Sequence, residues 1–334
     1  MKPIGAFVER GPWQPFETAS VVQRIAVSPL VRHLVTLQIR ETDTDLFPLN
    51  KQSLALLAQH APNLTSLWCA VELAPKNNPL VLPAKLQSLH LQLGSAYPNT
   101  EIEYTDAEIN GMLMTVAALP SLSHLHLRLS ALDDTCVELW LLAACSSLSD
   151  LTIEAIDGNP PDLSDAQVEQ IRSSLGQLQR LSLGQWVTSD ELARYLKPPV
   201  TARWQDIGSV RIDARSGKLL LRLPSVTKLD LCYERVTAHV DFLPQLPFLT
   251  VLNLQCDRRV GSGWGWMSPT DALLTSLPLC LSLTDLSLTC GFKSAYWCAL
   301  LAKLTKVKKL AFILGSSSRC NASRRDPSRS RSRS

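Results

Sequence analysis

Long apolar runs, paired cysteines and a leader-like N-terminus are all missing from this 334-residue sequence. No stretch approaches the roughly 20 consecutive apolar residues that cross a bilayer, so we expect no membrane span. The first residues, MKPIGAFVERGPWQPFE, lack the sustained apolar core of a secretory signal. The nine cysteines are dispersed and form no CxxC pair, which argues against a disulfide framework. We therefore expect a protein that is not secreted and that resides in the cytoplasm or nucleus.

Catalytic and phosphate-binding motifs are also missing. The sequence contains no HExxH, no nucleophile elbow and no GxxxxGK[ST] loop. A single arginine on a loop can act as a finger in GTP hydrolysis, and Arg258 or Arg40 can be nominated for that role. Nothing distinguishes these two from other arginines, so we expect no enzyme and no cofactor.

Positive charge is scarce outside the C-terminus. The total formal charge is +3, but residues 316–334 hold six arginines and one acid, Asp326. Removing the +5 of this segment leaves −2 for residues 1–315. Because nucleic-acid affinity depends on lysines and arginines that neutralise phosphates, we expect the body of the protein not to bind nucleic acid.

What the sequence does contain is one unit repeated along most of its length: leucine, two variable residues, leucine, one variable residue, leucine. A repeat of 20–50 residues is the signature of a stacked array of supersecondary units, and these units recur about every 27 residues. Numbered from the first leucine, positions 1, 4 and 6 are Leu34/Leu37/Ile39, Leu64/Leu67/Cys69, Leu86/Leu89/Leu91, Leu122/Leu125/Leu127, Leu148/Leu151/Ile153, Leu178/Leu181/Leu183, Ile207/Val210/Ile212, Val226/Leu229/Leu231, Leu249/Leu252/Leu254, Leu283/Leu286/Leu288 and Val307/Leu310/Phe312.

Strands and helices are expected to alternate within each unit. Alternation of apolar residues at positions 4, 6 and 8 is typical of a strand with one buried face. Helical patterns occupy several of the intervening stretches, and Thr105 with Glu108 forms a capping box. The expected helices are 53–60, 105–119, 164–175, one that begins near Ser268, and 294–304. We predict an α/β solenoid of about ten to eleven irregular repeats, with a curved parallel sheet inside and helices outside.

With these units, residues 30–314 resemble a leucine-rich repeat protein of the ribonuclease-inhibitor-like class, and they are similar to the repeat region of F-box/leucine-rich-repeat substrate receptors. The resemblance implies a surface for protein binding. One departure is that position 9, where the family places Asn or Cys, holds neither in any unit, so we expect irregular turns. The predicted organisation is an N-terminal cap over residues 1–29, the solenoid over 30–315, and a disordered Arg/Ser-rich tail over 316–334.

Positions 3, 5 and 7 of each unit are expected to point away from the core, onto the inner wall of the array. Tryptophan and arginine are favoured anchors in protein interfaces. The predicted partner footprint on this wall is Trp68, His90, His126, Arg128, Arg180 and Arg211. The alternative is an ordinary solvated face of a half-buried sheet.

Two further features have competing interpretations. His90, His124, His126 and Asp150 occupy neighbouring strands and have the side chains of a zinc site, but a flat sheet rarely converges such ligands, so no metal is predicted. The segment DRRVGSGWGWMS, residues 257–268, carries Trp264 and Trp266 among glycines. These tryptophans either contact a partner from a long loop or fold back over the core.

The tail SSSRCNASRRDPSRSRSRS resembles the RS tails of splicing-associated proteins, and phosphorylation of Ser328, Ser330 and Ser332 would reverse its charge. A plain solvated basic tail is the alternative. Taken together, the sequence predicts a non-enzymatic scaffold that binds a protein partner of unknown identity on the concave face. The alternatives are a substrate-recognition subunit of a ubiquitin ligase and a nuclear protein of RNA processing acting through its tail.

Overall fold

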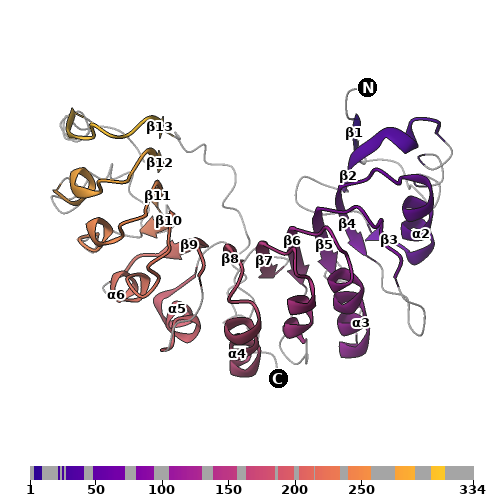
Figure 1. The fold of residues 1–334 in the computed structure, drawn as a ribbon, viewed down its shortest axis with the longest axis horizontal. Coiled ribbons are helices and arrows are strands. Elements are labelled where there is room, and N and C mark those ends of the chain that lie inside the picture. The colour runs from indigo at the N-terminus through magenta and orange to yellow at the C-terminus, as the bar shows by residue number, and fades with distance from the viewer. Residues whose placement is uncertain are drawn as a thin grey trace, which may run out of the picture.

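A computed structural model describes residues 4–9, 22, 25, 28–40, 48–71, 80–93, 105–129, 138–155, 163–184, 187–198, 203–213, 215–233, 240–256, 275–289 and 302–312. Over these residues the chain forms an arc whose strands line the inner wall and whose helices lie outside (Figure 1). The strands are β1 (Ile4–Glu9), β2 (Leu34–Arg40), β3 (Pro48–Leu49), β4 (Ser66–Val71), β5 (Ser88–Leu93), β6 (His124–Leu129), β7 (Asp150–Ala155), β8 (Arg180–Leu183), β9 (Asp206–Arg211), β10 (Lys228–Tyr233), β11 (Val251–Cys256), β12 (Asp285–Thr289) and β13 (Lys309–Phe312).

All strands belong to one parallel sheet in sequence order, with β3 beside β4 and off the main path. The eleven strands from β2 to β13, leaving out β3, correspond to the eleven predicted repeat units. Adjacent strands pair equivalent positions of neighbouring units, as when Leu89 lies opposite Leu125 and Leu125 opposite Leu151. The prediction of an α/β leucine-rich-repeat solenoid is therefore confirmed. Strand β1, within the predicted N-terminal cap, pairs with β2 and extends the sheet.

Helical segments connect many of the strands along the outer side. They are η1 (Val31–His33), α2 (Lys51–His60), α3 (Asp106–Ala117), η2 (Leu139–Ala144), α4 (Asp165–Ser174), α5 (Ser189–Tyr195), α6 (Ser216–Leu220), η3 (Leu243–Gln245) and η4 (Leu277–Leu279), where η marks a 3₁₀ helix. Thr105, Ser164 and Thr188 begin α3, α4 and α5 with capping boxes, in which each side chain accepts from the third backbone N–H of the helix.

The helices predicted over 53–60, 105–119 and 164–175 are confirmed as α2, α3 and α4. The helix expected near Ser268 and most of the one expected over 294–304 lie outside the described residues. Helices α5 and α6 were not expected from the sequence. None of the helices in the described part of the chain has the length and apolar character needed to span a bilayer.

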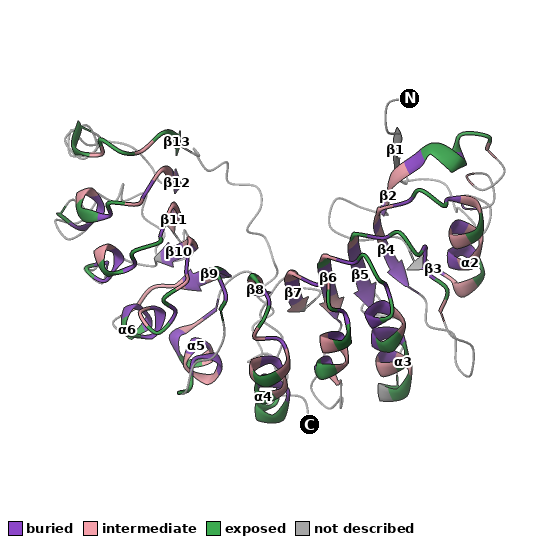
Figure 2. Ribbon diagram, in the orientation of Figure 1, coloured by how far each residue is buried: buried purple, intermediate pink, exposed green. Residues whose placement is uncertain are grey.

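The core lies between the sheet and the outer helices, where Figure 2 shows the buried residues. From β2 to β8, positions 1, 4 and 6 are all at most 5% exposed, and the helices contribute residues such as Leu54, Leu57, Val168 and Ile171. Each repeat thus completes its apolar contacts with its neighbours, as a solenoid requires. At the last repeat this burial fails, because Val307 is half-buried and Leu310 is 41% exposed.

The repeat at the ninth strand begins three residues earlier than the sequence pattern indicated. Asp206 lies opposite both Arg180 and Lys228, which occupy position 3 of their units, so position 1 of this unit is Trp204 rather than Ile207. Trp204 is 1% exposed, and its indole N–H donates to the Leu175 carbonyl at 3.3 Å. The frame shifts because a bulge at Gly208, with φ of 72°, inserts one extra residue into the strand.

A hydrogen-bonded spine runs along the start of the strands. The carbonyl at position 2 of one unit accepts the backbone N–H groups at positions 2 and 3 of the next, as the Thr227 carbonyl does from Thr250 and Val251. In six units a serine or threonine hydroxyl at position 2 donates to the same preceding carbonyl; the donors are Thr65, Ser123, Ser149, Thr227, Thr250 and Thr284. This spine joins the repeats even though position 9 lacks the usual Asn or Cys.

Candidate functional site

The concave wall of the sheet carries the side chains at positions 3, 5 and 7. Because the strands run parallel and in register from β4 to β7, residues at one position lie in a row across them. Neighbouring members of a row are about 4.8 Å apart. At this spacing, planar side chains on adjacent strands can stack.

Three aromatic rings form such a stack at position 5. The ring centroids of Trp68 on β4 and His90 on β5 are 4.5 Å apart, and those of His90 and His126 on β6 are 3.8 Å apart. The ring planes are tilted by 37° and 31°. His90, in the middle, is 8% exposed, whereas Trp68 and His126 are half-buried. We call Trp68, His90 and His126 the aromatic stack.

One carboxylate lies at the end of the aromatic stack, within ion-pair distance of two side chains. Glu154 Oε1 on β7 lies 3.0 Å from His126 Nε2 and 3.0 Å from Arg128 Nε. Arg128 Nη1 also donates to Gln92 Oε1 at 3.2 Å. Burial strengthens these contacts, since the side chains of Arg128 and Glu154 are only 13% and 17% exposed.

Glu154 and Gln92 were not among the predicted site residues. Both occupy position 7, and the register places Gln92, Arg128 and Glu154 side by side on β5, β6 and β7. Comparing position 7 across consecutive units of the sequence would have identified them.

A second polar cluster lies farther along the sheet, at position 3 of β8, β9 and β10 and at position 5 of β10 and β11. Asp206 Oδ2 lies 3.3 Å from Arg180 Nε and 3.1 Å from Lys228 Nζ, and Lys228 Nζ also lies 3.2 Å from Asp230 Oδ2. Asn253 Nδ2 donates to Asp230. The charges on β8, β9 and β10 therefore alternate in sign and compensate one another.

The six predicted footprint residues all lie on concave positions, but they fall into two groups. Trp68, His90, His126 and Arg128 are contiguous on β4 to β6. Arg180, on β8, belongs to the second polar cluster, and Arg211 lies at position 7 of β9. Two to three strands, or roughly 10–14 Å, separate these arginines from His126.

The other candidate residues lie apart from the aromatic stack or outside the described part of the chain. His124 Nε2 lies 3.4 Å from Asp150 Oδ2, so these two are paired as the register predicts. Among the described residues, no three His, Cys, Asp or Glu side chains are grouped so that they could hold a metal ion. Trp264 and Trp266 lie outside the described residues.

Comparison with known proteins supplies little beyond the geometry. No known protein family matches the sequence, and no curated protein is similar to it. Among solved structures, an internalin (InlF) from Listeria monocytogenes aligns over 86% of this chain and 77% of its own, at 16% identity and a TM-score of 0.39. The TLR13–ssRNA13 complex aligns over 80% of this chain but only 50% of its own, at 14% identity and a TM-score of 0.29. Likenesses this low say nothing about function, and the fold assignment rests on the repeat register and burial.

Proposed function

We propose that the protein is a non-enzymatic scaffold that binds a protein partner on the concave wall, with the aromatic stack at the centre of the contact. The observation that carries the proposal is the run of three stacked rings on an open sheet face. Clusters of aromatic and arginine side chains supply most of the binding energy in protein interfaces, and the aromatic stack has Arg128 beside it.

The aromatic stack and Arg128 are ordered before any partner arrives. His126 is held between His90 and Glu154, and Arg128 is held between Glu154 and Gln92. A binding surface whose side chains are already fixed loses less conformational entropy on association. In this proposal the partner binds a surface whose side chains do not need to rearrange on association.

The second polar cluster has a different role in this proposal. Its charges are engaged with one another, as Arg180 and Lys228 are with Asp206. Ion pairs that already compensate one another contribute little affinity but penalise a partner with mismatched charge. Arg180 thus contributes to specificity, while Trp68 supplies affinity.

The test is capture of partners from a cell lysate by the immobilised full chain, followed by mass spectrometry. The Trp68→Ala/Arg128→Ala variant should lose partners that the unchanged chain retains, because it removes one ring of the aromatic stack and the neighbouring arginine. We expect at least a tenfold loss of capture, as is typical when two interface anchors are truncated.

The matched control is Trp140→Ala/Arg203→Ala. Trp140 is 46% exposed on η2, and Arg203 is exposed in the turn before β9, so both lie away from the concave wall. This control should capture the same partners as the unchanged chain. Equal capture by the Trp68/Arg128 variant, with an unchanged melting temperature, would show that the aromatic stack does not bind them.

Two narrower functions remain predictions that the same experiment separates. Recovery of a cullin adaptor among the captured proteins would support a ubiquitin-ligase subunit. Loss of splicing-associated partners, and of nuclear residence, on deletion of residues 316–334 would support a role through the tail. Neither gains support from the described residues, so the general scaffold is the function we put forward.

A further inference from the structure

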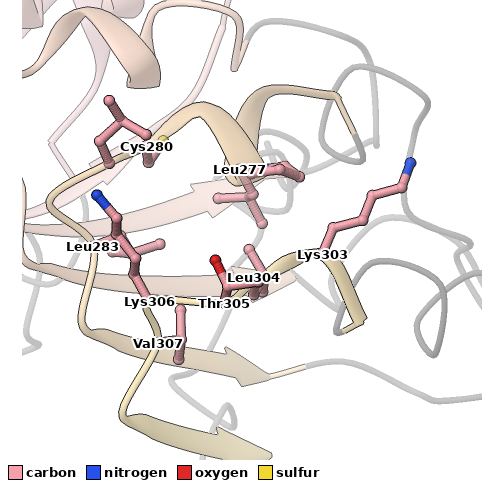
Figure 3. A pocket seen from close by; sticks show the side chains of 10 residues that line it. Leu277, Cys280, Leu283, Lys303, Leu304, Thr305, Lys306 and Val307 are labelled. Atoms are coloured by element: carbon pink, nitrogen blue, oxygen red, sulfur yellow. The ribbon is translucent and has the colours of Figure 1, made fainter.

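Three of the six histidines lie together on β5 and β6 of the concave wall. The ring centroids of His90 and His126 are 3.8 Å apart, and His124 lies two residues before His126 on the same strand. The small hollow between the turns before β12 and β13 has no histidine among its described lining residues (Figure 3). Because a solvent-exposed histidine has a pKa of about 6.5, the centre of the proposed binding surface can take up protons in mild acid.

Two of these histidines can carry a positive charge in their present positions. His126 Nε2 lies 3.0 Å from Glu154 Oε1, and His124 Nε2 lies 3.4 Å from Asp150 Oδ2. The side chain of His124 is also 61% exposed, so water can solvate its charge. Because a nearby carboxylate stabilises a protonated ring, protonation is compatible with the positions of both rings.

His90 has a different environment. It is 8% exposed and lies between the rings of Trp68 and His126. Burial disfavours the charged form of histidine, and a second charge on a ring 3.8 Å away disfavours it further. The indole of Trp68 attracts a cation, but this attraction is weaker than the cost of burying a charge. The aromatic stack is therefore stable only while His90 is neutral.

On β4, β5 and β6, the wall positions around His90 carry no acid that could offset a charge on its ring. These eight positions hold Ser66, Trp68, Ala70, Ser88, Gln92, His124, His126 and Arg128. Only the two histidines and Arg128 can be charged, and each of them is then a cation. Asp150 and Glu154 lie one strand farther away, on β7. Glu154 is shared by His126 and Arg128, so its one negative charge already faces two cations when His126 is protonated.

We propose that the aromatic stack is a proton-sensitive switch, which is closed while His90 is neutral and opens when His90 takes up a proton and turns toward solvent. The proton is bound in the open form and not in the closed form, so closure is favoured at neutral pH and is lost as the pH falls. Each pH unit below about 6.5 shifts the balance toward the open form about tenfold.

Opening removes the surface that we propose for partner binding. Trp68 loses the ring on which it stacks, and side chains that are no longer ordered lose more conformational entropy on association. The partner is therefore held at neutral pH and released in acid. This consequence rests on the proposed function, whereas the opening of the stack does not depend on any partner.

The experiment records ¹⁹F NMR spectra of the full-length chain, labelled with 5-fluorotryptophan, from about pH 7.5 to about pH 5. The chain has eight tryptophans, and the signal of Trp68 is identified by its loss in Trp68→Phe. We expect this signal to move toward that of an exposed indole as the pH falls, with the slope of a single proton. The signal of Trp140, which is 46% exposed on η2, should not move.

His90→Phe keeps a ring in the stack but cannot take up a proton, so it should abolish the movement of the Trp68 signal. The matched control is His33→Phe, which replaces an exposed histidine on η1 and should titrate like the unchanged chain. Both variants keep His124 and His126. If the larger ring prevents folding, His90→Gln also lacks a titratable group and makes the same test.

A Trp68 signal that keeps its position down to about pH 5 overturns the proposal. Movement that persists without a titratable group at position 90 also overturns it, as do Trp68 and Trp140 signals that change together because the chain unfolds. Partner capture is measured separately at neutral pH. Its failure would leave this titration unchanged, so the switch and the proposed function can fail independently.

Discussion

At the scale of single residues, the ninth strand depends on one glycine and one aspartate. Gly208 has φ of 72°, and a Cβ added there would lie 2.5 Å from Ser182 Oγ. The backbone N–H of Gly208 donates to Asp206 Oδ1 at 2.9 Å, and the same carboxylate faces Arg180 and Lys228 through its other oxygen. The bulge and the second polar cluster are therefore built by the same residues.

Replacing this glycine should be costly. Gly208→Ala is expected to lower the free energy of unfolding by about 1–3 kcal/mol, because alanine is strained at positive φ and its Cβ collides with Ser182. The control is Gly111→Ala within α3, where an added Cβ meets nothing within 4 Å; it should raise the free energy of unfolding by about 0.5–1 kcal/mol. Urea unfolding, monitored by circular dichroism, measures the free energy of unfolding of both variants. A Gly208→Ala variant more stable than the unchanged chain would contradict the bulge described at this residue.

The same strand shows why the sequence could be interpreted only in part. Searching for aliphatic residues at positions 1, 4 and 6 placed ten of the eleven units correctly, because the spacing of these three positions within a unit is constant even though the distance between units varies. Trp204 was missed, since a tryptophan at position 1 breaks the aliphatic pattern and the extra residue at Gly208 shifts everything after it. Ile207 and Val210 then matched the pattern in the wrong frame, and Asp206 was left out of the concave wall.

At the scale of elements, the position-2 spine explains how irregular repeats stay aligned. Each position-2 hydroxyl donates to a carbonyl that already accepts two backbone N–H groups of the next strand, as at Thr227 and Thr250. This contact lies at the start of the strand, where the chain leaves the outer turn. It therefore fixes the register before the apolar positions 4 and 6 are reached.

Removing one hydroxyl of the spine should have a small but measurable effect. Thr250→Val keeps the shape of the side chain and removes the 3.1 Å bond to the Thr227 carbonyl, so the free energy of unfolding should fall by about 0.5–1 kcal/mol. Thr115→Val is the control, because that hydroxyl bonds only to the Gly111 carbonyl within α3 and its loss should be neutral. The urea concentration at the midpoint of unfolding, measured for both variants, tests this difference. Equal midpoints would show that the position-2 hydroxyl does not stabilise the fold.

Helices were predictable where a recognisable N-cap residue precedes a long apolar pattern. The capping boxes at Thr105 and Ser164 precede long apolar patterns, and both helices were expected within two residues of their observed ends. The capping box at Thr188 and Glu191 was present in the sequence as well, but α5 has only seven residues. Helix α6 has only five residues. The Asp213 carboxylate accepts from the backbone N–H groups of Arg215 and Ser216 at its start, but the helix is too short for an apolar pattern to indicate it.

At the scale of the whole molecule, the concave wall of the arc has two chemically different parts. Strands β4 to β6 carry the aromatic stack, whereas β8 to β10 carry the compensated charges of the second polar cluster. The sequence indicated this wall because outward positions follow from the repeat.

The stacking itself also had to come from the structure. The repeat places Trp68, His90 and His126 on adjacent strands, but the pattern alone does not decide whether their rings stack or diverge. At one end of the stack, Glu154 lies 3.0 Å from both His126 Nε2 and Arg128 Nε, a contact that the repeat pattern does not indicate.

The most direct test of the central claim, that partners bind the concave wall at the aromatic stack, is site-specific photo-crosslinking. A photoreactive residue placed at Thr152, which lies beside His126 in register on β7, should cross-link the partner captured by the unchanged chain. The same residue at Trp140, on the outer side, should give none. Cross-linking from Trp140 and not from Thr152 would contradict the account.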